Sequence, residues 1–440
     1  MSSPAQSNSQ VYPHKSQQSM LLRKALLIGL FVVLLTDMTP LLRIGIMPGL
    51  SGKNLLLYIV VFTILVRIAT DSRGLRFSDL DVHAPFILMI VYAMFTIVIA
   101  SMLSPAFDML RGLVTLKNQM VDLFLFMFAF RYGLEHREDF LSMLRFVIVT
   151  MLLVSIVTLI DFLNIPDLGI TGTYKGRIEG PIGAANQYGA LLVFLLPISI
   201  AAISPALRGW KKWLWWFGIF VMGVLLVATG SRGALAALVS GSAIGAFILR
   251  RYIDMRQAAR VAVVAFGFFL VVIVIYTIFN PEFLLERFNK TTSANIYVAS
   301  SGRLEIWTAS ILVMLEWPWS FLVGYGWNSF ESSGIWKAAH NEYVDRLYEL
   351  GVIGLSLYIW LLYQITTRAR RRLRTADPEL RRIFIGYVFS MSTVVVSIFF
   401  AALPGPWTIF WVITGLVMGL QATPVSDSAE IDQRSGAPVD

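Results

Sequence analysis

Three short segments carry side chains that could bind a phosphate or move a proton. Arg232 lies in TGSRGA, Arg303 lies in SGRLEIW, and His340 begins HNEYVDRLYELG. A guanidinium group binds phosphate oxygens through two parallel hydrogen bonds and keeps its charge at any physiological pH. A histidine accepts a proton near neutral pH. Together these residue types suit the handling of a phosphorylated ligand, with the arginines neutralising a leaving phosphate and the histidine assisting an attacking hydroxyl.

Each of these residues also has a structural interpretation. Arg232 could extend to lipid phosphates or cap the preceding helix, and Arg303 could meet head groups from an interfacial helix. A lone histidine is more often structural than catalytic. Ser231 and Asn341 are neighbouring groups that could add hydroxyl and amide contacts to a ligand.

Several carboxylates compete with His340 for the role of base. They lie in the same part of the chain and cannot be ranked by spacing alone: Glu305, Glu331, Glu342 and Asp345.

The composition places these segments in a membrane protein. The chain has 440 residues, of which 57% are hydrophobic and only 14% are charged, and its mean hydropathy is +0.70. A helix needs about 20 apolar residues to cross the hydrocarbon core. By this criterion about twelve spans are expected, at roughly 21–38, 54–69, 84–103, 112–130, 141–163, 188–205, 212–228, 233–249, 261–280, 344–367, 383–402 and 406–421.

The basic residues predict the orientation of these spans. Lys and Arg gather in alternate loops, at 73–76, 131–137, 208–212, 250–260 and 368–382, and an excess of positive charge marks cytoplasmic loops. Both tails, 1–20 and 422–440, are then cytoplasmic, and both are expected to be disordered. Because the net charge of +9 is explained by topology, binding to nucleic acid is not expected.

Three outer segments do more than connect spans. Residues 161–187 form a Gly-rich loop that contains Lys175 and Arg177, residues 229–233 form a tight turn, and residues 281–343 are too long for a simple connector. Loops held by a rigid scaffold commonly carry function. We therefore expect the site in these segments.

Periodicity predicts two helices in the third outer segment and after it. From Arg303 onward an amphipathic helix is expected, with Leu304, Trp307, Ile311 and Met314 on one stripe. A second helix is expected to begin near Asn341, and a spacing of four, three and four then places one set of residues on a common face. That set is His340, Val344, Leu347 and Gly351.

A transport function is the alternative of a different class. Lys117 and Asp122 lie within the fourth span and are the best argument for a polar path through the membrane. No internal inverted repeat supports such a path. The chain has no cysteine, so thiol catalysis and cysteine metal sites are excluded, and no metal or other cofactor is expected.

The order of the three motifs resembles that of the O-antigen ligase family. TGSRGA at 229–234 is followed by SGRLEIW at 301–307 in a large outer loop, and then by HNEYVDRLYELG at 340–351 and the closing helices. The family shares a superfamily with O-antigen polymerases and protein O-oligosaccharyltransferases. The spacing of His340, Asn341 and Gly351 is the more ligase-like signature.

The resemblance implies an all-α polytopic glycosyltransferase of the GT-C type, with a large helical periplasmic loop. It would move a glycan from undecaprenyl pyrophosphate to a sugar hydroxyl of lipid A-core, without a metal ion and with inversion, at the periplasmic face of a bacterial inner membrane. Arg232 and Arg303 would hold the pyrophosphate, and His340 would assist the acceptor or the phosphate. Arg177 and Asn186 resemble a further pair of the family, although the usual Pro-Asn pairing is absent.

The expected organisation is one integrated membrane domain. Residues 21–280 form the first nine spans, 281–343 the periplasmic segment and 344–421 the last three spans. A polysaccharide polymerase or a protein O-oligosaccharyltransferase would use the same lipid donor with another acceptor. A lipid-linked sugar transporter, or a scaffold without chemistry, would not need the arginines and the histidine together.

Overall fold

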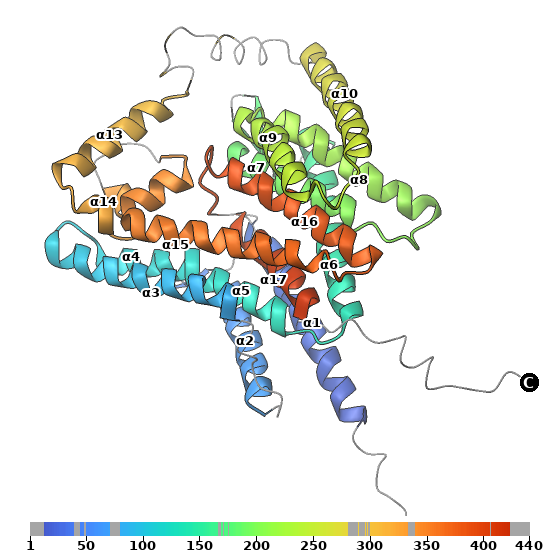
Figure 1. Cartoon of the computed structure of the whole chain (residues 1–440), viewed down its shortest axis with the longest axis horizontal. Helices are drawn as coiled ribbons and strands as arrows, with labels where there is room; N and C mark the ends of the chain where they lie inside the picture. Colours follow the sequence, from blue (N-terminus) through green and yellow to red (C-terminus); the bar gives the residue numbers. More distant parts are fainter. Residues whose placement is uncertain are drawn as a thin grey trace, which may run out of the picture.

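The computed structural model describes residues 13–38, 45–47, 50–70, 80–165, 169, 171–174, 176–279, 289, 295, 297, 300–332, 339–404 and 406–422. These residues form a bundle of helices (Figure 1). The helices of the first half are α1 (Pro13–Met38), α2 (Gly52–Thr70), α3 (Leu80–Leu103), α4 (Met109–Leu116), the π-helix η3 (Lys117–Val121), α5 (Asp122–Tyr132), α6 (Arg137–Phe162), α7 (Ala185–Ala201) and α8 (Gly209–Ala228).

The second half of the chain continues the bundle. Its helices are α9 (Arg232–Leu249), α10 (Met255–Phe279), α13 (Arg303–Glu316), α14 (Ser320–Val323), the 3-10 helix η4 (Ser329–Ser332), α15 (Glu342–Arg372), α16 (Pro378–Ser397) and α17 (Trp407–Ala422). Two small antiparallel hairpins, absent from the all-α prediction, pair β1 (Gly45–Met47) with β2 (Leu50–Ser51) and β3 (Gly172–Tyr174) with β4 (Arg177–Gly180).

The prediction of a polytopic membrane protein is confirmed. Among the described residues, eight helices are long and apolar enough to cross a membrane, and two shorter apolar helices, Ala185–Ala201 and Trp407–Leu420, accompany them. The other two expected spans, 21–38 and 261–280, fall on α1 and α10, which have 26 and 25 residues.

The expected disordered tails are only partly within the described residues. Residues 1–12 and 423–440 lie outside them. Residues 13–20 belong to α1, so the prediction of a disordered tail up to residue 20 is wrong there. Pro13 is the first residue of that helix, a position where its fixed φ and missing N–H are tolerated. The helix then continues through the polar residues that precede the first apolar run.

Helix α17 forms part of the buried centre of the bundle. It packs against α5 and α6 (Figure 1), and its described side chains are all buried. Gly415 and Gly419 permit close contacts, since an added Cβ would lie 2.5 Å from the Met127 carbonyl oxygen and 2.0 Å from the Phe140 ring, respectively. Small residues let membrane helices approach closely without a hydrophobic driving force between them.

Small residues also fix helix α9, which begins at Arg232. Gly233, Ala237 and Gly241 lie one turn apart and are buried, on the face that packs against α16. An added Cβ at Gly241 would lie 2.5 Å from the Thr393 Cα atom, and one at Gly233 would lie 2.4 Å from the Phe400 Cβ atom. This close packing sets the position of the arginine at the start of α9.

Helix α15 bends sharply at Gly351. Gly351 has φ 62° and ψ −169°, which is not helical. The rings of Tyr343 and Tyr358 have centroids only 6.4 Å apart, whereas 15 residues of straight helix would separate them by about 22 Å. The expected straight span at 344–367 is therefore wrong in its first part, because residues 342–350 form a separate arm before the bend.

The turn after α14 stabilises this bend. The backbone N–H groups of Tyr325 and Gly326 donate to the carbonyl oxygens of Tyr348 and Glu349, at 2.9 Å each. A bend deprives such carbonyls of their helical partners, and an unpaired buried carbonyl is costly. The turn supplies the missing donors and so holds the arm at a fixed angle to residues 352–372.

Alanine at position 351 is expected to destabilise the protein. The added Cβ would lie 2.3 Å from the Leu322 carbonyl oxygen, and a positive φ is itself unfavourable for alanine. We expect a loss of about 1–3 kcal/mol, measured as a lower thermal unfolding temperature in detergent. The matched control is Gly267→Ala in α10, where a Cβ meets nothing within 4 Å; equal unfolding temperatures for the two variants would contradict the role of Gly351.

Candidate functional site

The turn between α8 and α9 is organised by Ser231, which is the N-cap of α9. The Ser231 hydroxyl accepts a hydrogen bond from the Ala234 N–H, and the residue is only 4% exposed. A serine at this position satisfies a backbone donor that the helix leaves unpaired. Ser231 therefore shapes the turn, and Arg232 follows it as the first residue of α9.

The start of α13 brings the second arginine to the first. Ser301 and Gly302 both have positive φ, 59° and 77°, and Arg303 follows as the first residue of α13. The Arg232 Nη2 donates to the Ser301 hydroxyl at 2.9 Å. Two residues separated by α9, by α10 and by the first part of the large outer segment are thus placed next to each other.

The two guanidinium groups repel each other. Burial lowers the pKa of Arg303, and the neighbouring charge of Arg232 lowers it further. Within the described part of the chain, the Arg303 guanidinium makes no hydrogen bond or ion pair. An anion bound between the two arginines would relieve this repulsion and supply acceptors for the Arg303 guanidinium.

Helix α13 is correctly predicted, and Met314 of the expected stripe is buried, but the rest of the buried face differs. The buried residues are Ile306, Ser310 and Met314, whereas Ile311 of the expected stripe is only half-buried. The difference arises because α13 packs against the arm of α15 in a small apolar cluster. The Trp307 ring lies beside this contact, and its Nε1 donates to the Ala339 carbonyl at 2.9 Å.

His340 precedes α15 and does not belong to it. Its φ is 50°, a left-handed conformation that is uncommon for residues other than glycine. Asn341 is the N-cap of the helix, and its side-chain oxygen accepts from the N–H groups of Tyr343 and Val344. The expectation that His340 shares a helical face with Val344 and Leu347 is wrong, because the helix begins after it.

Arg177 and Asn186, the further pair in the resemblance, lie together in the structure. The Arg177 Nη2 donates to the Asn186 side-chain oxygen at 2.7 Å, and the Arg177 Nε donates to the Thr229 carbonyl at 2.8 Å. The second bond ties β4 to the turn that carries Arg232. Lys175, the other basic residue expected in this loop, lies outside the described residues.

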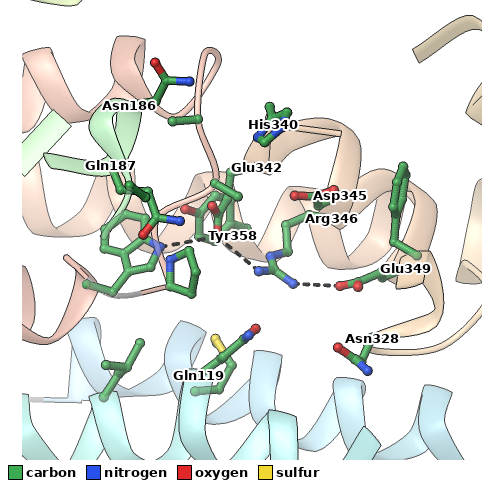
Figure 2. A pocket seen from close by; sticks show the side chains of 18 of the residues that line it. Gln119, Asn186, Gln187, Asn328, His340, Glu342, Asp345, Arg346, Glu349 and Tyr358 are labelled. Carbon is green, nitrogen blue, oxygen red and sulfur yellow. Dashed lines mark hydrogen bonds and ion pairs between the residues drawn. The ribbon is translucent and has the colours of Figure 1, made fainter. Parts of the chain in front are cut away.

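A cavity of about 610 Å³ opens among these segments. Three of the expected site residues line it, namely Arg177, Asn186 and His340. Figure 2 shows His340 above the arm of α15, with Gln119 on the opposite wall. Arg232 and Arg303 do not line the cavity. They are connected to it by the bond from Arg177 to Thr229 and by the bond from Trp307 to the residue before His340.

The arm of α15 brings a buried ion-pair network to the cavity. Arg346 donates to Glu342 at 3.0 Å and to Glu349 at 2.7 Å, and its guanidinium carbon lies 4.1 Å from the centroid of the Trp327 ring. Glu342 also accepts from the Leu403 N–H at 3.1 Å. Sequence reasoning did not select Arg346 or Glu349. The available signal was four charged residues within 342–349, directly before an apolar run.

The four carboxylates that could replace His340 as the base lie in different surroundings in the structure. Glu305 is exposed on α13 and does not line the cavity, and the side chain of Glu331 lies outside what the structure describes. Glu342 is held in the ion-pair network. Asp345 lines the cavity, and its side-chain carboxylate makes no hydrogen bond or ion pair with any described residue.

The charges that favoured a transport path pair with each other. Lys117 Nζ lies 3.0 Å from Asp122 Oδ2, and the Tyr58 hydroxyl donates to the other Asp122 oxygen at 2.9 Å. Lys117 is the first residue of η3 and Asp122 follows its last residue; η3 is a π-helical turn that interrupts the α-helix between α4 and α5. Such turns are frequent at functional sites. This one places Gln119 and Met120 in the lining of the cavity.

Among the described residues, no group of three or more His, Asp and Glu side chains is arranged to hold a metal ion.

A comparison with curated proteins finds no significant match. A scan against protein families matches residues 217–359 to the model Wzy_C, described as O-Antigen ligase. This range contains the arginine pair, His340 and the whole arm of α15. Residues 217–359 of the chain are therefore similar to the Wzy_C domain family.

Proposed function

We propose that the protein is an O-antigen ligase, which transfers a glycan from undecaprenyl pyrophosphate to a sugar hydroxyl of lipid A-core. The observation that carries the proposal is the half-buried Arg303, which has no partner among the described residues and lies beside Arg232. Two neighbouring guanidinium groups, one of which has no partner among the described residues, are suited to a pyrophosphate. In a poorly hydrated site such groups stabilise charge as it develops on the leaving group.

The cavity lined by Arg177, Asn186 and His340 suits sugar groups. Trp407 and Trp411 line one part of it, and the side chains of Gln119, Gln187 and Asn328 line others. Aromatic rings can pack against the apolar faces of sugars, and amides donate to and accept from hydroxyl groups. A cavity of this size and mixed lining supports a ligand larger than a phosphate alone.

The proposed reaction needs no metal ion. The acceptor hydroxyl oxygen attacks the anomeric carbon, the bond from that carbon to the phosphate oxygen breaks, and undecaprenyl pyrophosphate leaves with the electron pair. Attack from the opposite face inverts the anomeric configuration. Arg232 and Arg303 offset the charge of the leaving group, with Arg177 and Asn186 lining the adjacent wall. His340 assists either as base for the hydroxyl or as ligand of the phosphate.

The proposal includes a location. The positive charges of alternate loops favour cytoplasmic termini and a site at the periplasmic face of a bacterial inner membrane. All the loops that meet at the cavity would then lie on the periplasmic side. The partners are the lipid-linked glycan, lipid A-core and the surrounding membrane lipids, and the family match supports lipid-linked glycan substrates.

The choice of acceptor tests this proposal. The purified wild-type protein would be supplied with undecaprenyl-pyrophosphate-linked glycan, first alone, then with lipid A-core, and then with an acceptor protein rich in serine and threonine. The proposal predicts glycan on lipid A-core only, seen by gel and mass spectrometry. Longer glycans on the lipid donor would indicate a polymerase, and glycan on the protein would indicate a protein O-oligosaccharyltransferase. No transfer at all would favour the transporter.

A further inference from the structure

Asp345 differs from the other carboxylates of α15 in its hydrogen bonding. Glu342 accepts hydrogen bonds from Arg346, the Leu403 N–H and the Trp407 Nε1. Glu349 accepts from Arg346 and from backbone groups of Asn328 and Phe330. Asp345 lies between them in sequence, lines the same cavity, and has no such bond with a described residue. Its oxygens are therefore available to a ligand.

Tyr358 gives a second, independent indication of a ligand. This residue is 4% exposed, yet its hydroxyl has no hydrogen-bond partner among the described residues. It lines the cavity from the part of α15 after the bend, within electrostatic reach of Asp345. A buried hydroxyl without a partner costs free energy. A bound hydroxyl group would remove that cost.

The surroundings of Asp345 fix its position at the start of the arm. Its N–H donates to the Asn341 carbonyl in the first turn of α15, and the N-terminal end of a helix favours a carboxylate. Arg346 is bound to the two glutamates on either side of Asp345. Figure 2 shows Asp345 between His340 and the Arg346 ion pairs.

The remaining carboxylate of the cavity is placed less favourably. Glu179 lines the cavity from β4. Its Oε2 lies over the neighbouring strand, where a Cβ added to Gly172 would meet it at 2.8 Å. Asp345 is thus the carboxylate on the arm of α15 that combines access to the cavity with unused hydrogen-bond capacity.

We propose that Asp345 and Tyr358 form the subsite for the acceptor sugar, and that Asp345 takes the proton of the attacking hydroxyl. This inference rests on the proposed function. The sugar oxygen forms a bond to the anomeric carbon as its O–H bond breaks, and the proton passes to the Asp345 carboxylate. Undecaprenyl pyrophosphate leaves with the electron pair of the broken bond. Tyr358 donates to a neighbouring sugar hydroxyl, and His340 then serves the phosphate.

The test compares Asp345→Asn with wild type in purified protein, at saturating undecaprenyl-pyrophosphate-linked glycan and varied lipid A-core. Asparagine keeps the shape but cannot take the proton, so kcat is expected to fall at least about 100-fold. Binding of the lipid-linked donor is expected to stay within about twofold, because Asp345 does not contact the phosphate in this account. Glu305→Gln is the matched control, since Glu305 is exposed and outside the cavity.

The pH dependence of transfer distinguishes a catalytic role of Asp345 from a purely structural role. In the wild type, kcat/KM is expected to fall at low pH as the base becomes protonated, and Asp345→Asn is expected to lose this limb. The charged groups that face Asp345 are Glu342, Arg346 and Glu349, with His340 nearby on the cavity wall. If the fall in kcat/KM at low pH is unchanged in Asp345→Asn, that fall belongs to the titration of another group, and the inference is overturned.

Two further variants distinguish a loss of catalysis from a folding defect. Asp345→Glu keeps the carboxylate and is expected to recover more activity than Asp345→Asn. Tyr358→Phe keeps the ring and is expected to raise the KM for lipid A-core about fivefold, with kcat little changed. Wild-type kinetics in Asp345→Asn, or no gain for glutamate over asparagine, would contradict the assignment. A wild-type protein that transfers nothing to lipid A-core would instead refute the proposed function.

Discussion

Arg303→Ala is expected to lower glycan transfer to lipid A-core by about 100-fold to 1,000-fold, which is the usual loss when one fixed group that stabilises a leaving oxygen is removed. Arg232→Ala is expected to have an effect of the same order, because it faces the same developing charge. Both variants should insert and fold normally. The guanidinium of Arg303 has no partner among the described residues, so its removal leaves no buried acceptor unsatisfied.

The measurement is the initial rate with purified variants, together with the affinity for the lipid-linked pyrophosphate. Arg303→Lys should recover part of the rate, since lysine keeps the charge but loses the two-pronged hydrogen bonding. Arg260→Ala serves as control, because that arginine is exposed at the start of α10. Normal transfer by Arg232→Ala or by Arg303→Ala would remove that residue from the site.

Arg346→Met is expected to cost about 3–5 kcal/mol of stability, because it leaves the carboxylates of Glu342 and Glu349 buried without their cation. These three residues are 8%, 4% and 7% exposed, respectively. The loss would be measured as a lower midpoint of thermal unfolding in detergent. Activity is expected to be lost as well, since the network holds the arm that carries Asp345.

A neutral network gives the control for this prediction. Replacing all three residues, with Glu342→Gln, Glu349→Gln and Arg346→Met, removes the unpaired charges and should restore much of the lost stability. A single Arg346→Met variant as stable as the wild type would contradict the account of the network. The same would follow if the triple replacement were less stable than the single one.

The membrane organisation could be predicted from the sequence because it depends on local composition. Apolar runs of sufficient length locate most of the helices, and charges at their ends fix the boundaries to within a few residues. The start of α9 at Arg232 and the start of α15 after Asn341 follow from capping residues that are visible in the sequence. Local signals of this kind do not require knowledge of tertiary contacts.

The shape of the site could not be predicted, because it depends on contacts between distant segments. The bend at Gly351 needs the turn at Tyr325 and Gly326 to supply hydrogen bonds. The predicted stripe of α13 was displaced because its neighbour, the arm of α15, was not foreseen. Arg232 and Arg303 were selected from their types and from the resemblance, whereas their proximity is seen only in the structure, where Arg232 donates to Ser301.

The chemistry on the arm of α15 was missed for a related reason. Glu342 and Asp345 were noticed as possible bases, whereas Arg346, Glu349 and Tyr358 were counted within an expected span. Their roles depend on which carboxylate pairs with Arg346 and which is left available. Pairing of this kind follows from the bend and from the loop at Leu403, and neither is encoded in local spacing.

The central claim is that glycan passes from undecaprenyl pyrophosphate to lipid A-core in this protein without a metal ion and with the help of His340. The most direct measurement follows both products at once, in EDTA, for the wild type and for His340→Ala in liposomes. The account predicts that the wild type releases one undecaprenyl pyrophosphate for each glycan joined to lipid A-core, and that His340→Ala does neither at a comparable rate. Equal transfer by the two proteins, or release of the lipid without glycan on lipid A-core, would contradict it.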